Sequence, residues 1–325
     1  MEVDLEFLRT HRVVGRKVAI RILVGIANLL IRRIGRTQVV WQGKSLPDHP
    51  VIIATNHTHR LDFLPMWVDL IHGGHLLTGW VKARMYKHRR ARWMMRSTGY
   101  NIPLVSKGYL IAADFKELFD RRPGEGEYRR LRDHLDHRQP LPKSPTFERL
   151  QTQERSILGC RFEPHKETYR EALVDLYYRM MSRALDLAGK AVNVGAHLHI
   201  YPEGEVSQRL TRGHTGIVHV ALALDLPIVP VGISGIAEAY IGNGPLTRGG
   251  EVRICVGEEL EVDPELGGPD FRPFHPDDQV ACDRRFQEVT DRVMKALNQL
   301  VDPSLRSERE RGGSPQSDGV ERFYR

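Results

Sequence analysis

The sequence predicts an α/β fold, and three features support this prediction. Short apolar strands alternate with amphipathic helices along the chain. Polar residues follow directly after several of these strands, at the position where α/β folds place their functional sites. The chain has 325 residues, 41% hydrophobic and 27% charged, which is ordinary for a globular protein with one sizeable core.

The predicted elements follow one another in a regular order. We expect strands at 38–42, 51–54, 80–83, 99–105, 197–201, 227–233 and 252–256. We expect helices at 62–71, 87–97, 166–189, 216–224 and about 280–300. The strand at 227–233 contains Pro230, which indicates an edge strand or a stretch whose backbone donors are not all paired.

Residues 1–37 are predicted to form a basic amphipathic segment that contacts a membrane. Between Phe7 and Pro47 there are nine Lys or Arg and no Asp or Glu. The longest uncharged stretch, 22–31, has ten residues and is too short to span a bilayer. We therefore expect a helix that lies in the interface of an anionic membrane, with a core helix that has a solvated basic face as the alternative.

The main domain is predicted to span residues 38–301, with a charged insertion at about 109–165. The insertion is rich in Arg, Asp, Glu, Pro and His, and we expect solvated surface helices and loops there. Residues 302–325 are polar and are predicted to be a disordered tail. The acidic residues near the N-terminus argue against a signal peptide, and the three widely spaced cysteines fit a reducing compartment.

An acid–base pair follows the strand at 51–54. His57 can take a proton near neutral pH, and Asp62, five residues later, can bind the other ring nitrogen and stabilise the imidazolium. The sequence has no obvious Ser or Cys nucleophile motif. The pair is therefore expected to activate a hydroxyl group of a substrate.

Four motifs in this order resemble those of the glycerolipid acyltransferases typified by lysophosphatidic acid acyltransferase. Asn-His-x4-Asp is complete as Asn56, His57 and Asp62. The second motif, a Gly-x-Ile-Pro-like strand followed by Arg, is represented by residues 99–103 with Lys107 as the nearest cation. The fourth motif, an apolar Val-Pro-Val strand, is met by residues 228–231.

The third motif of that family is Phe-Pro-Glu-Gly-Thr-Arg-Ser. It corresponds here to residues 201–204, which include Glu203 and Gly204, and to Ser207. Glu205 and Val206 replace the Thr and Arg of the motif. Its first residue is Tyr201, which we expect only to pack.

The resemblance implies a mixed sheet flanked by helices, of the glycerol-3-phosphate acyltransferase type. It implies that His57 deprotonates a lipid hydroxyl as the oxygen attacks an acyl thioester, while Asp62 orients His57. The thioester of acyl-CoA or acyl carrier protein is then a co-substrate, and no further cofactor or metal is expected. Substrate binding is expected to involve five residues: Asn56, Lys107, Glu203, Gly204 and Ser207.

The departures from the motifs bear on the acceptor. Lys lacks the planar fork with which Arg binds a phosphate, and Glu205 would repel a phosphate at close range. We therefore expect an acceptor other than plain lysophosphatidic acid, with Arg209, Arg212 or Lys82 as alternative cations. The predicted enzyme acts in phospholipid biosynthesis as a peripheral or monotopic protein at the cytoplasmic face of a membrane.

Two other hypotheses remain open. A metallohydrolase is possible because His57, His59, His197 and His199 accompany Asp62, although their spacing does not fit a His-x-His-x-Asp-His motif. A non-catalytic lipid-binding protein on the same fold is the second. Nucleic-acid binding is not expected, because no recognition motif accompanies the net charge of +7. The sequence leaves the oligomeric state open.

Overall fold

The computed structural model describes residues 2–13, 17–98, 101–242, 244 and 246–307. In this part of the chain one mixed sheet has the strand order β1-β9-β8-β2-β7-β3-β4. All neighbours pair in parallel except β8 and β9. The strands are β1 (Thr37–Gly43), β2 (Ile52–Thr55), β3 (Leu76–Lys82), β4 (Asn101–Leu104), β7 (Ala196–Ile200), β8 (Ile228–Ser234) and β9 (Gly250–Val256). The predicted α/β fold with a mixed sheet is therefore confirmed.

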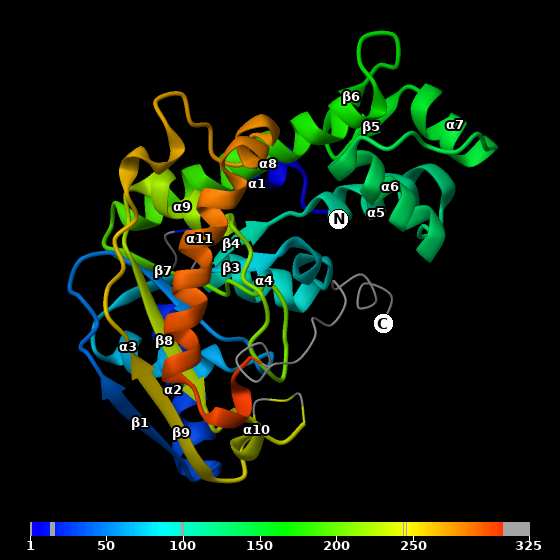
Figure 1. The fold of residues 1–325 in the computed structure, drawn as a ribbon. Coiled ribbons are helices and arrows are strands. Elements are labelled where there is room, and N and C mark those ends of the chain that lie inside the picture. The colour runs from blue at the N-terminus through cyan, green and yellow to red at the C-terminus, as the bar shows by residue number, and fades with distance from the viewer. Residues whose placement is uncertain (1, 14–16, 99–100, 243, 245, 308–325) are drawn as a thin grey trace.

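Helices cover both faces of the sheet (Figure 1). On one face, Ile52 of β2 belongs to a core shared with α8 (Tyr169–Val192), α9 (Gly216–Leu224) and α11 (Pro276–Leu300). On the other face, Ile53 packs with Met66 and Leu70 of α3 (Phe63–His72). Successive side chains of a strand point to opposite faces, so a strand covered on both sides needs an unbroken apolar run.

The N-terminal segment is helical; its first helix packs on α8 and its second helix packs on α3. It comprises α1 (Leu5–Thr10), α2 (Lys17–Asn28) and the π-helical turn η1 (Leu29–Ile34). Val24, Ala27 and Ile31 form a small core with Val68 of α3. Away from this core, α2 and η1 expose six large apolar side chains, those of Val18, Ile22, Leu23, Ile26, Leu29 and Ile34. Within the described residues, no helix has the length and apolar character needed to cross a membrane.

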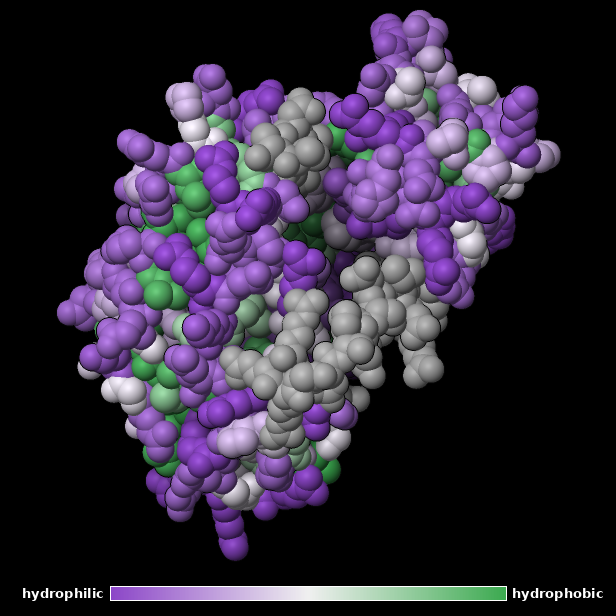
Figure 2. All heavy atoms as spheres, in the orientation of Figure 1, coloured by the Kyte–Doolittle hydropathy of each residue, from purple (hydrophilic) through white to green (hydrophobic). Residues whose placement is uncertain are grey.

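The insertion forms a lobe that projects from the end of the sheet near β4 (Figure 1). It contains α5 (Lys107–Phe119), α6 (Glu125–His137), α7 (Pro145–Thr152) and the hairpin of β5 (Arg155–Ile157) and β6 (Cys160–Phe162). Its outer surface is mostly hydrophilic (Figure 2). However, Leu110, Phe115, Leu131 and Leu150 are buried. The expectation of a merely solvated insertion is therefore wrong for its inner face, which extends the main core.

Pro230 lies in an interior strand, so the expectation of an edge strand is wrong. β8 pairs with β2 on one side and β9 on the other. The proline sits where the ladder with β9 begins, and its carbonyl oxygen accepts the N–H of Gly257 at 2.8 Å. The reciprocal hydrogen bond, from residue 230 back to Gly257, cannot form because proline has no backbone N–H.

The remaining elements connect or close the domain. They are η2 (Ala83–Lys87), α4 (Arg89–Thr98), α10 (Ile236–Ala239), η3 (Pro264–Gly267) and η4 (Pro303–Leu305). Most of the predicted tail, from residue 308 onward, lies outside the described residues. The same holds for residues 99 and 100 of the second motif.

Candidate active site

The fold brings His57 and Asp62 together at the carboxyl edge of β2. Nδ1 of His57 lies 3.1 Å from Oδ2 of Asp62, the residue immediately before α3. The Asp62 side chain is fully buried, whereas the His57 side chain is 16% exposed. A buried carboxylate needs compensating donors. Oδ2 receives two further hydrogen bonds, from the N–H of Thr58 at 2.8 Å and the N–H of His59 at 3.1 Å.

This arrangement fixes the chemistry that His57 can perform. When Nδ1–H donates to Asp62, the unprotonated Nε2 remains as the basic nitrogen. The carboxylate then stabilises the imidazolium once Nε2 has taken a proton. The pair is thus suited to general-base catalysis on a hydroxyl group.

Tyr201 joins this pair, so the expectation that it only packs is wrong. Its hydroxyl donates to Oδ1 of Asp62 at 2.7 Å. Its ring stacks on the imidazole of His57, with centroids 3.8 Å apart and an interplanar angle of 21°. Burial, and then the Asp62 carboxylate, raise the pKa of Tyr201 well above its ordinary value.

Glu203 lies beneath the loop that carries His57. The residue is 2% exposed, and its Oε1 accepts the backbone N–H of His57 at 3.0 Å. Its Oε2 accepts the backbone N–H of Thr211 at 2.8 Å and the hydroxyl of Thr211 at 3.0 Å. Burial raises the pKa of Glu203 to about 6, against the opposing effect of these hydrogen bonds. Both carboxylate oxygens are therefore bound by the protein itself.

Gly204 and Ser207, the next predicted residues of the third motif, lie in the same connection between the loops after β2 and β7. Gly204 has φ of +69°, a left-handed conformation that favours glycine, and a Cβ there would lie 3.2 Å from Cδ2 of His214. The backbone N–H of Ser207 donates to the carbonyl oxygen of His57 at 2.7 Å. The loops after β2 and β7 are thus bound to each other on both sides of His57.

Lys107 is the one predicted site residue that the structure does not bring to this place. It is the first residue of α5, after β4, and β4 is separated from β2 by two other strands. Three strand spacings correspond to roughly 14 Å. Its Nζ pairs with Oδ1 of Asp136 at 2.9 Å and lies 5.7 Å from the ring centre of Tyr177. The charge of Lys107 is therefore engaged within the lobe.

Within the described residues, the other histidines near the sheet do not combine with His57 and Asp62 into a metal-binding cluster. Nδ1 of His199 accepts the indole N–H of Trp67 at 3.2 Å, and its Nε2 lies 2.8 Å from the hydroxyl of Thr55. Burial lowers the pKa of His199 to about 3, so this ring stays neutral. Nε2 of His197 faces Nδ1 of His75 at 3.1 Å. Among the residues that the structure describes, no group of three or more His, Cys, Asp or Glu is arranged to hold a metal ion.

Sequence reasoning missed several contributions to this site. The tyrosine in place of phenylalanine at 201 was a visible signal, but nothing marked Thr211, eight residues beyond Glu203. The buried hydroxyls of Thr58, within the loop, and of Tyr240, beside it, have no hydrogen-bond partner in the described part of the chain. Tyr240 packs against His59, with ring centroids 4.9 Å apart.

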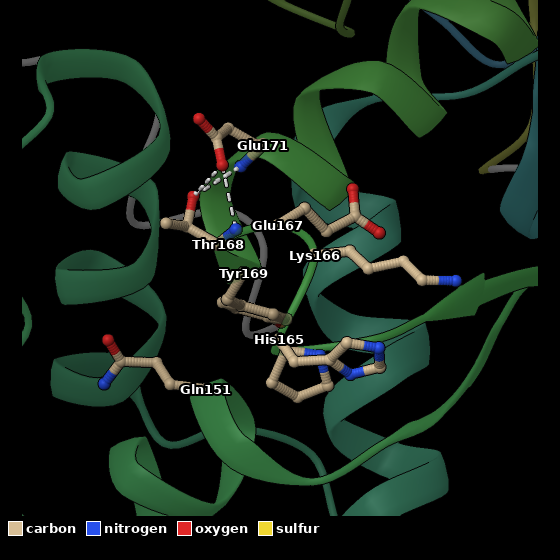
Figure 3. Close-up of a pocket in the computed structure, with 8 residues that line it drawn as sticks. Gln151, His165, Lys166, Glu167, Thr168, Tyr169 and Glu171 are labelled. Atoms are coloured by element: carbon tan, nitrogen blue, oxygen red, sulfur yellow. Dashed lines mark hydrogen bonds between the residues drawn. The ribbon is translucent and has the colours of Figure 1, made fainter.

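A second candidate site is a pocket in the lobe, away from His57 (Figure 3). It lies at the start of α8 and is lined by Gln151, Pro164, His165, Lys166, Glu167, Thr168, Tyr169 and Glu171. Oε2 of Glu171 accepts the backbone N–H of Thr168 at 2.8 Å, and this bond caps α8. These polar groups serve the end of a helix, so the His57 region remains the candidate active site.

Comparison with known protein families finds a match to this chain. A family model described as Acyltransferase matches residues 160–234. This segment includes β7, the third motif and β8, whereas His57 and Asp62 precede it. The match confirms the resemblance to acyltransferases and the prediction that the chain is an acyltransferase enzyme.

Two further comparisons were made, one with solved structures and one with curated proteins. The chain is similar to the crystal structure of the 1-acyl-sn-glycerophosphate (LPA) acyltransferase, PlsC, from Thermotoga maritima. The two are 14% identical over 82% of this chain and 80% of that chain, with a TM-score of 0.40. The comparison with curated proteins gives no match.

Proposed function

We propose that this acyltransferase moves a fatty acyl group from an acyl thioester to a hydroxyl of a lysophospholipid or a related glycerolipid. The donor is acyl-CoA or acyl carrier protein. The observation that carries the proposal is the hydrogen bond of 3.1 Å between Nδ1 of His57 and Oδ2 of the buried Asp62. This pair lies at the carboxyl edge of β2, and both neighbouring strands, β7 and β8, lie in the segment that matches the acyltransferase family.

The residues suggest the following reaction. Nε2 of His57 takes the proton of the acceptor hydroxyl while its oxygen bonds to the thioester carbonyl carbon. The carbon–sulfur bond then breaks, and the departing thiolate takes the proton from Nε2–H to leave as a thiol. Asp62 stabilises the imidazolium between these two transfers. The acyl group passes directly to the acceptor, so no covalent enzyme intermediate is required.

For the acceptor, we propose a glycerolipid other than plain lysophosphatidic acid. Val206 is exposed at a position where the family motif has Arg, and Glu205 precedes it. Lys107, the other expected phosphate ligand, is paired with Asp136. Lys82 ends β3, which is adjacent to β7, and it is the better-placed cation for a negatively charged head group.

Acyl transfer to a panel of acceptors tests this function. Radiolabelled acyl-CoA and acyl carrier protein thioesters are offered with lysophospholipids and neutral lipid alcohols. We expect one acceptor class to be labelled by the wild type, and the rate to fall at least about a hundredfold in His57→Ala and Asp62→Asn. His72→Ala, an exposed histidine at the far end of α3, is the matched control. Folded His57→Ala protein with full activity would refute the mechanism, and a wild type that labels no acceptor but binds lipid would favour the lipid-binding hypothesis.

We also propose that the outward side of α2 and η1 contacts an anionic membrane at its cytoplasmic face. Val18, Ile22 and Ile26 follow helical spacing and are exposed, and Arg21 lies exposed among them. An amphipathic helix with apolar and basic exposed residues is typical of interfacial binding. On α4, which contacts α2, Trp93 is 73% exposed beside several arginines, and tryptophan favours the same interface.

Sedimentation with vesicles tests this contact. Wild type is expected to bind phosphatidylglycerol-containing vesicles and to release them at high salt, because the charge contribution is screened. The double variant Ile22→Glu, Ile26→Glu is expected to stay in the supernatant. Val194→Glu, an exposed valine after α8, is the matched control. Equal sedimentation of the double variant and wild type would refute the contact.

A further inference from the structure

We infer that Tyr201 is a positioning residue that sets the orientation and the basicity of His57. This inference rests on the proposed role of the His57–Asp62 pair. Where the family motif has phenylalanine, this chain has a tyrosine, whose ring and hydroxyl both reach the catalytic pair. The hydroxyl is thus an addition that the general acyltransferase motif does not contain.

The sheet topology explains why Tyr201 reaches this place. β2 and β7 are adjacent and parallel, with Ala54 opposite Ile200. The residues that follow these strands therefore leave the same edge side by side. His57 is the second residue after β2 and Tyr201 is the first residue after β7, so the two rings meet face to face, with centroids 3.8 Å apart.

The ring of Tyr201 limits the freedom of the imidazole. His57 is held by the bond from Nδ1 to Asp62, which by itself allows the ring to tilt about that bond. The Tyr201 ring stacks on one face of the imidazole, with an interplanar angle of 21°, and so fixes the plane of the imidazole and the direction in which Nε2 points. A general base must be aligned with the proton that it accepts, so the rate depends on this plane.

The hydroxyl of Tyr201 acts on the charge of Asp62. It donates to Oδ1 at 2.7 Å, whereas Nδ1 of His57 lies 3.1 Å from Oδ2 and 3.3 Å from the same Oδ1. The hydroxyl cannot compete as an acid, because burial and the nearby carboxylate keep it protonated. Each donor that stabilises the carboxylate weakens its hold on the imidazolium, so removal of this hydroxyl should make His57 more basic.

The other ionisable groups that face His57 do not depend on this hydroxyl. Glu203 binds the backbone N–H of His57 from below. His199 lies on β7 next to Tyr201, with ring centroids 4.6 Å apart, and is neutral because burial lowers its pKa to about 3. Both remain in a Tyr201→Phe variant, so a change in the titration of His57 can be assigned to the hydroxyl.

The experiment compares two substitutions at this position. Tyr201→Phe keeps the stacked ring and removes only the oxygen, and phenylalanine is the family's own residue there. Tyr201→Leu removes the aromatic contact as well. Tyr169→Phe is the matched control, because Tyr169 is also buried and donates to a carboxylate, Oδ2 of Asp114 at 2.8 Å, within the lobe.

Two readouts are measured for each protein, the pH dependence of kcat/KM for acyl transfer and the titration of His57 by NMR of its ring nitrogens. For Tyr201→Phe we expect the acidic limb of the profile and the NMR titration to move together to higher pH by roughly half a unit to one unit. For Tyr201→Leu we expect, in addition, at least about a tenfold loss of kcat/KM at the plateau. Tyr169→Phe should change neither.

The outcomes separate this inference from the proposed function. A Tyr201→Phe profile and titration equal to those of wild type, or shifted to lower pH, would overturn the role of the hydroxyl. A plateau rate unchanged in folded Tyr201→Leu would overturn the role of the ring. An inactive wild type, or an active His57→Ala, would refute the proposed function instead, and the NMR titration would still report whether Tyr201 controls His57.

Discussion

The side chain of Asn56 forms a closed pair of hydrogen bonds with the backbone of Ile233. Nδ2 donates to the carbonyl oxygen of Ile233 at 2.9 Å, and the N–H of Ile233 donates to Oδ1 at 2.7 Å. β2 ends at Thr55 while β8 continues to Ser234, so the amide takes the place of the next backbone pair. Asn56 thereby anchors the start of the His57 loop to the sheet.

The first prediction concerns this anchor. Asn56→Asp keeps the acceptor but replaces the donor by an oxygen that faces a buried carbonyl. We expect the free energy of unfolding to fall by about 2–4 kcal/mol, measured by urea denaturation. Asn193→Asp, at the exposed end of α8, is the control and should change stability little. A substrate-binding role without anchoring would instead leave the stability of Asn56→Asp unchanged and raise KM.

A second prediction separates two roles for Lys107. Its partly buried pair with Asp136 joins α5 to α6, so Lys107→Gln should lower the free energy of unfolding by about 1 kcal/mol. KM for the acceptor should stay within about twofold, because the charge is already engaged in the lobe. Steady-state kinetics beside thermal unfolding provide the check. A rise in KM of tenfold or more for a phosphate-bearing acceptor would support the role that the sequence predicted.

Much of the fold could be predicted because the apolar pattern is local. Residues 51–54 form an unbroken apolar run, and a strand covered on both faces requires one. The buried face of α5 was missed because charged and polar residues interrupt its apolar positions, as Asp114 does beside Phe115. Asp114 is neutralised there by Arg155, a partner 41 residues away that no local pattern reveals.

The site could be predicted only in part, for a related reason. His57 and Asp62 lie in one short loop, so their spacing in the sequence already implies their contact. The partners that complete the site come from other strands. Tyr201 contacts Asp62 only because the sheet order places β7 beside β2, and Lys107 stays apart because β4 is at the edge. Strand order depends on tertiary packing, which a single sequence does not disclose.

A third prediction concerns the buried ion pair that holds the lobe together. Nε and Nη2 of Arg155 donate to the two oxygens of Asp114, each at 2.7 Å, and the Asp114 side chain is fully buried. Arg155→Met leaves this carboxylate with Tyr169 as a remaining donor. We expect a loss of about 3–5 kcal/mol in the stability of the lobe, seen as faster hydrogen exchange in α6 and α7.

The same hairpin offers a matched control for that experiment. Arg161 on β6 pairs with Glu154, but its side chain is 71% exposed. Exposed pairs contribute little to stability, so Arg161→Met should leave the exchange of α6 and α7 unchanged. Equal effects of the two substitutions would mean that the lobe is stabilised by its net charge and not by the buried pair.

The last prediction follows from the pKa of Glu203. Burial raises this pKa from the ordinary value of 4.5 to about 6, so the folded protein favours the protonated carboxyl. The stability gained from this preference is complete below pH 4.5 and is lost as the pH rises through 6. The rise in pKa corresponds to about 2 kcal/mol.

The variant Glu203→Gln isolates this contribution, because the amide stays neutral at every pH. The difference in the free energy of unfolding, wild type minus variant, should fall by about 2 kcal/mol between pH 4 and pH 7. Urea denaturation at a series of pH values measures it, with the exposed Glu238→Gln as control. A difference that grows with pH would mean that the three hydrogen bonds from His57 and Thr211 outweigh burial. In that case Glu203 would be a stable anion beneath His57, and its charge would add to that of Asp62 in raising the basicity of the imidazole.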